Sequence, residues 1–136
     1  MNRVSHFYRL EHISNIPILH AAKDVSQGII MSDAIAQASP IPAVGLIGME
    51  CSEKIEDGQK YYDVKIVANL DSYPSIPYLS CFVLTATDGS RVVIGDGSRP
   101  MPKPLVTEKR GQKASEPTLY QLTITISSTT PPLRVV

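Results

Sequence analysis

The sequence predicts a mainly β domain, an antiparallel β-sandwich or partly open barrel with one or two short helices and long loops. Two of the three Asp-Gly pairs, Asp57-Gly58 and Asp88-Gly89, lie between runs of strand-forming residues, which is typical of β-hairpins. Two further segments, 61–70 and 118–127, alternate between apolar and polar residues. Such alternation indicates strands with one buried and one solvated face.

The strongest hairpin signal lies in residues 79–97, where Asp88-Gly89 separates two runs rich in β-branched and aromatic residues. A two-residue type I′ turn at this pair would place Leu84 opposite Val93. One face of the hairpin would then carry Phe82, Leu84 and Val93, and the other Val83, Val92 and Ile94. Because both faces are apolar, we expect both to be covered, either inside a sandwich or under a partner chain.

The N-terminal third is less regular. Residues 3–13 alternate loosely and predict a first strand. Residues 15–24 predict a short helix, because Pro17 suits a first helical turn. Residues 32–38 predict a second helical turn, since Ser32 and Asp33 are good N-caps and Pro40 follows. On the predicted first strand, one face carries Val4, His6, Tyr8 and Leu10.

The middle of the chain returns to strand patterns. Residues 43–51 predict a strand, and the charged segment 52–60, interpreted as a loop, contains the second turn signal, Asp57-Gly58. In residues 61–70 the apolar face carries Tyr62, Val64, Ile66 and Ala68, whereas Lys65 and Asn69 lie on the solvated face. Pro74 and Pro77 then mark a loop.

The C-terminal third begins with a proline-rich, basic segment, 99–117. Pro100, Pro102 and Pro104 exclude a central strand, so we expect an edge segment followed by a long projecting loop. Residues 118–127 predict the closing strand. The single domain then covers residues 1–128, and residues 129–136 form an extended C-terminal arm that ends in exposed apolar residues.

Charge is divided unevenly along a chain whose net charge is zero. From Arg99 to the end, six basic residues stand against two acidic ones, so this part is +4 and the rest −4. Such a chain can pack head to tail with copies of itself; equally, the basic segment can be a solvated loop. No aromatic residue lies between Arg99 and Pro117 to stack on bases, and we expect no nucleic-acid partner.

No constellation of residues points to catalysis or to a cofactor. Cys51 and Cys81 are the only cysteines, and we expect buried thiols rather than a disulfide. His6, His12 and His20 lack metal-ligand spacing. The sequence therefore predicts no enzyme, no metal, no cofactor and no small-molecule substrate. The sequence has neither an N-terminal apolar segment of the kind found in signal peptides nor a run of about 18 apolar residues, so we expect no membrane insertion.

The order of these segments resembles the small β-sandwich structural proteins of the tail and head-to-tail neck of tailed bacteriophages. The resemblance lies in the first strand with Ser-Asn-Ile-Pro-Ile-Leu (14–19), the strand at Tyr61, the hairpin Phe-Val-Leu-Thr-Ala-Thr-Asp-Gly-Ser-Arg-Val-Val-Ile-Gly, the basic loop and Tyr-Gln-Leu-Thr-Ile-Thr-Ile-Ser. It implies a virion protein, assembled in the host cytoplasm, that contacts copies of itself and other virion structural proteins.

Two surfaces are expected to make those contacts, the loop 99–117 and the C-terminal arm. The interaction residues expected on them are Arg99, Lys103, Lys109, Arg110, Lys113, Leu133, Arg134, Val135 and Val136. The alternative is a monomeric β-sandwich module that binds a small ligand or a carbohydrate. Oligomerisation separates the two, because the module would stay monomeric at high concentration.

Overall fold

The chain forms one large, mostly antiparallel sheet, and the prediction of a mainly β protein is confirmed. The computed structural model describes residues 2–14, 23–24, 29–30, 35, 38–77, 80–95, 101–109, 119–129 and 131–135. The strands in these residues are β1 (Asn2–Ile13), β2 (Lys23–Asp24), β3 (Ile29–Ile30), β4 (Ser39–Ile41), β5 (Ile47–Glu56), β6 (Gln59–Leu70), β7 (Cys81–Ala86), β8 (Arg91–Ile94), β9 (Lys103–Lys109), β10 (Leu119–Ser128) and β11 (Leu133–Val135).

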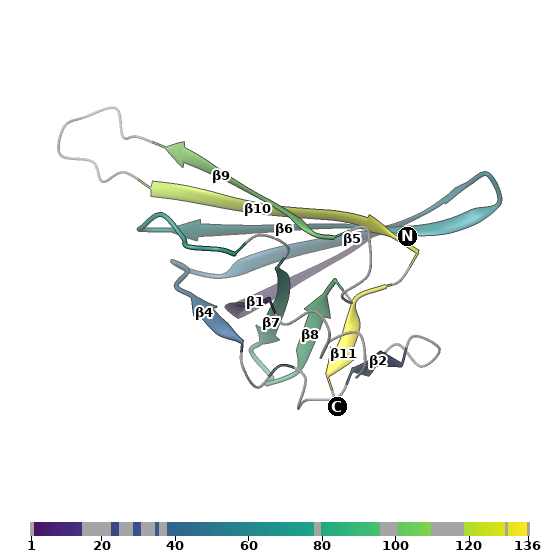
Figure 1. Cartoon of the computed structure of the whole chain (residues 1–136), viewed down its shortest axis with the longest axis horizontal. Helices are drawn as coiled ribbons and strands as arrows, with labels where there is room; N and C mark the ends of the chain where they lie inside the picture. Colours follow the sequence, from purple (N-terminus) through teal and green to yellow (C-terminus); the bar gives the residue numbers. More distant parts are fainter. Residues whose placement is uncertain are drawn as a thin grey trace.

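Strand β1 joins two halves of this sheet. Its N-terminal part pairs with β5, whereas its C-terminal part pairs with β7 on one side and β4 on the other. The strand order is β2-β3-β11-β8-β7-β1-β5-β6-β10-β9. Figure 1 shows the long strands β5, β6, β10 and β9 above β1 and the shorter β7, β8 and β11 below it. Whether these halves are best classed as a sandwich or a partly open barrel stays a prediction.

The two halves share a hydrophobic core, called here the first core. Strand β6 alternates as the sequence predicts, with Val64, Ile66 and Ala68 buried and Lys65 and Asn69 exposed. The same core includes Leu122 and Ile124 of β10, Ile47 and Met49 of β5, and Phe82, Leu84 and Ile94 of the β7–β8 hairpin. The polar face of β5, β6 and β10 is therefore left on the outside.

The β7–β8 hairpin is covered on both faces, as expected, but its predicted register is wrong by one residue. Phe82 pairs with Ile94, Val83 with Val93 and Leu84 with Val92. The Gly89 amide donates to the Ala86 carbonyl, and the Ala86 amide donates to the Ser90 carbonyl. These two hydrogen bonds close a three-residue loop over 87–89, in which Gly89 has φ 90°. In this register the paired residues Phe82 and Ile94 both lie in the first core, whereas the paired residues Val83 and Val93 both lie in a second core.

Strand β1 is confirmed, but its predicted alternation fails at Tyr8. The pairing with β7 shifts between Phe7 and Arg9, so one extra residue is accommodated there as a β-bulge. Phe7 and Leu10 are both buried in the first core, whereas Tyr8 is exposed. The bulge therefore turns Tyr8 away from the apolar face on which the sequence pattern placed it.

The C-terminal segment is part of the sheet, which corrects the expectation of an exposed arm. Strand β11 lies between β8, with which it pairs antiparallel, and β3, with which it pairs parallel. The Leu133 side chain is 1% exposed and lies in the second core with Ile13, Ile30, Ile35, Cys81, Val83 and Val93. It covers the second apolar face of the β7–β8 hairpin, so the cover comes from the chain itself.

Two other predictions change in part. Segment 99–117 contains an edge strand, as expected, but β9 spans Lys103–Lys109, so these residues are not a projecting loop. A helix over 15–24 is wrong at Lys23–Asp24, which pair with β3 in an extended conformation. The rest of that helix, almost all of 32–38 and the loop residues 110–117 lie outside the described residues.

Candidate interaction surface

The β5–β6 hairpin extends beyond its neighbouring strands. On one side its pairing with β1 ends at Asn2 and Ser52, and on the other side its pairing with β10 ends at Tyr62 and Ser128. Residues 53–61, called here the projecting hairpin, therefore have no further strand beside them within the described part of the chain. Figure 1 shows this two-stranded extension leaving the sheet at the right of the view.

The turn of the projecting hairpin follows from its sequence. Asp57 has φ 52° and Gly58 has φ 76°, and both values are required by a two-residue type I′ turn. Glu56 and Gln59 pair directly on either side of it. The hairpin signal at Asp57-Gly58 is confirmed, whereas the surrounding charged segment 52–60 is strand on both sides of the turn rather than loop.

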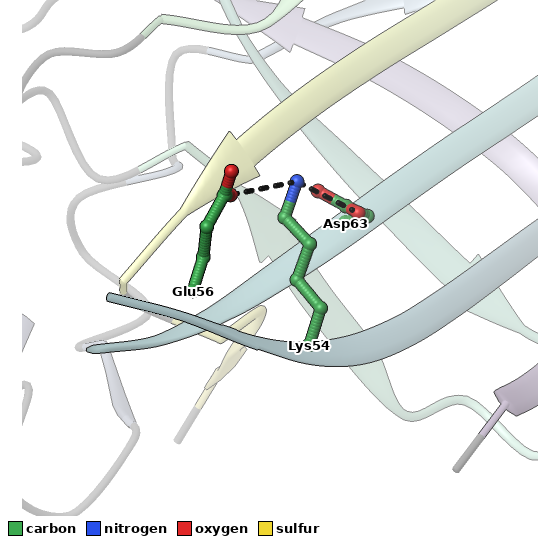
Figure 2. Close-up of polar contacts among 3 residues, drawn as sticks. All are labelled: Lys54, Glu56 and Asp63. Atoms are coloured by element: carbon green, nitrogen blue, oxygen red, sulfur yellow. Dashed lines mark ion pairs between the residues drawn. The ribbon is translucent and has the colours of Figure 1, made fainter. Parts of the chain in front are cut away.

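Charged side chains stabilise the hairpin on its surface. Lys54 Nζ lies 3.8 Å from Glu56 Oε2 and 3.4 Å from Asp63 Oδ2, and Figure 2 shows Lys54 between the two carboxylates. Lys60 Nζ lies 3.2 Å from Glu53 Oε2. Each such exposed pair contributes at most about 1 kcal/mol, so the pairs orient the hairpin rather than hold the domain together.

The pKa shifts agree with these contacts. A hydrogen bond to Glu53, followed by attraction to the same carboxylate, raises the pKa of Lys60. A hydrogen bond from Ser127, with a smaller contribution from Lys54, lowers the pKa of Asp63. Each shift favours the charged form, the ammonium group of Lys60 and the carboxylate of Asp63. Cationic Lys54 and Lys60 also lie 5.9 and 5.5 Å from the ring centroids of Tyr61 and Tyr62.

One large apolar side chain stands out on this charged hairpin. Ile55, which lies two residues before the Asp57-Gly58 turn, is 78% exposed. A single exposed apolar residue is ordinary on a protein surface. Here it lies on a two-stranded extension whose backbone edges are also open, and such edges can pair with another strand.

Strand β9 is a second open edge. It pairs with β10 and ends the described strand order. Pro104 lacks an N–H group and Lys103 is exposed, and both features discourage uncontrolled pairing at an edge. Leu105 is nevertheless 66% exposed, so this edge combines an apolar side chain with open backbone groups.

The residues expected to form the interaction surface do not gather in one place. Lys103 and Lys109 belong to β9, but Arg134 and Val135 belong to β11, which lies on the other side of β1 in the strand order. Leu133 is buried and is no contact residue. The side chain of Lys109 and the whole of Arg99, Arg110, Lys113 and Val136 lie outside the described residues.

A pocket of about 400 Å³ lies across β5, β6, β10 and the start of β9. Cross-strand pairing aligns Glu50, Lys65, Thr125 and Lys103 in one row. The full lining is Glu50, Ser52, Asp63, Val64, Lys65, Met101, Lys103, Thr125, Ile126 and Ser127. This row carries one carboxylate, two amines and one hydroxyl, so the pocket can accept a small polar molecule, but it has no aromatic platform among its described lining residues.

Other candidate chemistry is sparse in the described residues. No disulfide joins Cys51 to Cys81; Cys81 is buried, as expected, whereas Cys51 is only half-buried. Within the described ranges, no three His, Cys, Asp or Glu side chains come together as a metal site. His12 has a buried Nδ1 without a described hydrogen-bond partner, and burial lowers its pKa.

Comparison with protein-family models, with curated protein sequences and with solved structures gives no significant match for this chain. Across the residues that the structure describes, no helix has the length and apolar character needed to cross a membrane.

Proposed function

We propose that this protein is a structural component of a tailed-bacteriophage virion, in the tail or neck, that assembles in multiple copies through protein–protein contacts. The observation that carries the proposal is the projecting hairpin, a two-stranded extension that contributes no residue to either hydrophobic core of the described chain, yet has a type I′ turn and ion pairs. A hairpin of this kind adds little to the stability of its own domain. Its shape is explained if it contacts another chain.

The expected contact surfaces are revised accordingly. The projecting hairpin and the edge strand β9 replace the C-terminal segment, because Leu133 is buried in the protein's own core. Lys103 and Lys109 keep the role that the sequence suggested, since they belong to the edge strand. The assignment to a phage virion rests on the resemblance in strand order, and the role as a contact protein rests on these two open edges.

The test is native mass measurement of the chain, alone and with the products of neighbouring genes, compared with a shortened hairpin. Deleting residues 53–56 and 59–62 joins Ser52 and Asp63, which already pair, to the native Asp57-Gly58 turn. The full chain should form multi-subunit species, and the shortened chain should fold but lose them. Monomers of the full chain under every condition would overturn the proposal.

A second candidate is a monomeric module that binds a small ligand or a carbohydrate. The 400 Å³ pocket over Glu50, Lys65 and Lys103 favours it. These charged side chains suit a small charged or hydroxylated molecule better than a sugar ring that needs an aromatic platform. Calorimetric titration with charged small molecules and oligosaccharides, together with a monomeric mass, would support this candidate over the first.

A further inference from the structure

Two open edges on one chain raise the question of which surface each one meets. The projecting hairpin has unpaired backbone edges on both of its strands beyond Ser52 and Tyr62. Strand β9 has its outer edge open in the described structure. Figure 1 shows the projecting hairpin leaving the sheet on one side while β9 runs toward the opposite side. The hairpin tip is therefore directed away from β9 of the same molecule.

The two edges differ in charge. The projecting hairpin, residues 53–61, contains three acidic and two basic residues, a net charge of −1. Strand β9 contains two lysines and one glutamate, a net charge of +1. Opposite charge favours contact between a hairpin and a β9 edge.

Like charge opposes the symmetric alternatives. Two projecting hairpins facing each other would bring acidic side chains together, and two β9 edges would bring lysines together. Each edge also carries one prominent apolar side chain, Ile55 at 78% and Leu105 at 66% exposure. An apolar contact surrounded by complementary charges is the usual composition of a protein–protein interface.

We propose that the projecting hairpin of one copy docks on the β9 edge of a second copy, with Ile55 near Leu105. The inference rests on the proposed function and names the partner of its contact surface. The contact joins two different surfaces, so it is head-to-tail and leaves one free hairpin and one free edge at the ends of every open assembly. Repetition of such a contact closes into a ring or extends as a filament.

Mixing two defective variants tests this arrangement. The hairpin variant, Ile55→Lys with Glu56→Lys, changes the contact surface of the projecting hairpin and leaves β9 unchanged. The edge variant, Lys103→Glu with Leu105→Asp, changes the contact surface of β9 and leaves the projecting hairpin unchanged. All four side chains are exposed, so both variants should fold, which far-UV circular dichroism checks. At low salt, native mass spectrometry with one variant labelled with ¹⁵N should show oligomers for the wild type, monomers for each variant alone and mixed dimers for the pair.

The matched control is Leu46→Lys, which introduces a charge at an exposed apolar residue outside both edges and should oligomerise like the wild type. Higher ionic strength should weaken the wild-type contact because it screens exposed charges.

Variants that oligomerise like the wild type, or a mixture that stays monomeric, would overturn the head-to-tail contact and leave the proposed function standing. A wild-type chain that assembles only with other gene products would do the same. A chain that never assembles would overturn both.

Discussion

Lys54 and Asp63 face each other across the β5–β6 hairpin, with Nζ 3.4 Å from Oδ2. Lys54 lies within the projecting hairpin, and Asp63 lies where β6 returns to the sheet beside Ser127. A second carboxylate, Glu56, approaches the same ammonium group from the side of the turn (Figure 2). Lys54 thus links the turn to the sheet. Its ion pairs orient the projecting hairpin but contribute little to the stability of the domain.

Removing this lysine should separate local order from global stability. Lys54→Ala breaks two exposed ion pairs, so the free energy of unfolding should change by less than about 1 kcal/mol. Amide hydrogen exchange in residues 53–61 should nevertheless become faster, because the projecting hairpin has few other contacts. Chemical denaturation and exchange measured by mass spectrometry check the two expectations. Equal exchange in variant and wild type would show that the ion pairs do not order the hairpin.

Truncating the Leu133 side chain should strongly lower the free energy of unfolding, although Leu133 lies only a few residues from the end of the sequence. Leu133→Ala leaves a cavity in the second core, and buried Leu→Ala changes typically destabilise by about 2–5 kcal/mol. Arg134→Ala, at the neighbouring exposed position, should change stability by less than about 0.5 kcal/mol. Urea unfolding followed by circular dichroism compares them. Equal midpoints for the two variants would place β11 outside the core.

His12 should make the fold less stable in mild acid. Burial lowers its pKa below the ordinary 6.5 in the folded chain, so the unfolded chain takes up a proton at higher pH than the folded chain does. Stability from this group is therefore complete above about pH 6.5 and decreases as the pH falls toward the lowered folded pKa. His12→Gln should flatten the dependence of unfolding free energy on pH in this range.

The carboxylates provide the contrast for the histidine experiment. Hydrogen bonds from Ser127 and Ser90 lower the pKa values of Asp63 and Asp88 below the ordinary 3.8. Their contribution is present above that value and is lost only as the pH falls through their folded pKa values. The His12→Gln variant should keep the decrease in the free energy of unfolding that protonation of these two carboxylates causes at low pH. Identical curves for variant and wild type between pH 5 and 7 would contradict the role given to His12.

The strands were predictable where a local pattern alone determines them. Val64, Ile66 and Ala68 on β6, and Leu122 and Ile124 on β10, alternate with polar residues because one face of each strand meets the core and the other meets water. That pattern needs no knowledge of the partner strand. The two Asp-Gly pairs likewise predicted where the chain turns.

What sequence reasoning missed depends on partners elsewhere in the chain. Asp-Gly suits both the two-residue turn at 57–58 and the three-residue loop closed by Gly89, so the register of the second hairpin could not be read locally. The bulge at Tyr8 arises because β1 must pair with both β5 and β7.

The candidate site was predicted only in part. An apolar tail residue such as Leu133 has the same pattern whether it packs on its own sheet or on a neighbour's. The lysines of β9 were identified because charge density is visible in the sequence. The projecting hairpin was missed because its alternating charges suggested a solvated loop; Asp57-Gly58, flanked by residues that could pair by charge, was the available signal.

Three glycines allow backbone strain and crowding to be measured separately. At Gly48 an added Cβ meets nothing within 4 Å, so Gly48→Ala should leave stability unchanged or raise it by up to about 1 kcal/mol. At Gly89 there is also open space, but φ is 90°. Gly89→Ala should therefore cost about 1–2 kcal/mol, the strain of a left-handed conformation.

Gly95 combines both penalties, so its substitution should be the most damaging of the three. Its φ is 89°, and a Cβ would lie 2.8 Å from Pro102 Cγ and 2.9 Å from Cys81 Sγ. Gly95→Ala should cost roughly 1–3 kcal/mol more than Gly89→Ala, because crowding of a packed core adds to the strain. Urea unfolding of all three variants tests this order. If Gly95→Ala were no worse than Gly89→Ala, Pro102 would have to move freely, and the packing of the segment before β9 against the second core would be wrong.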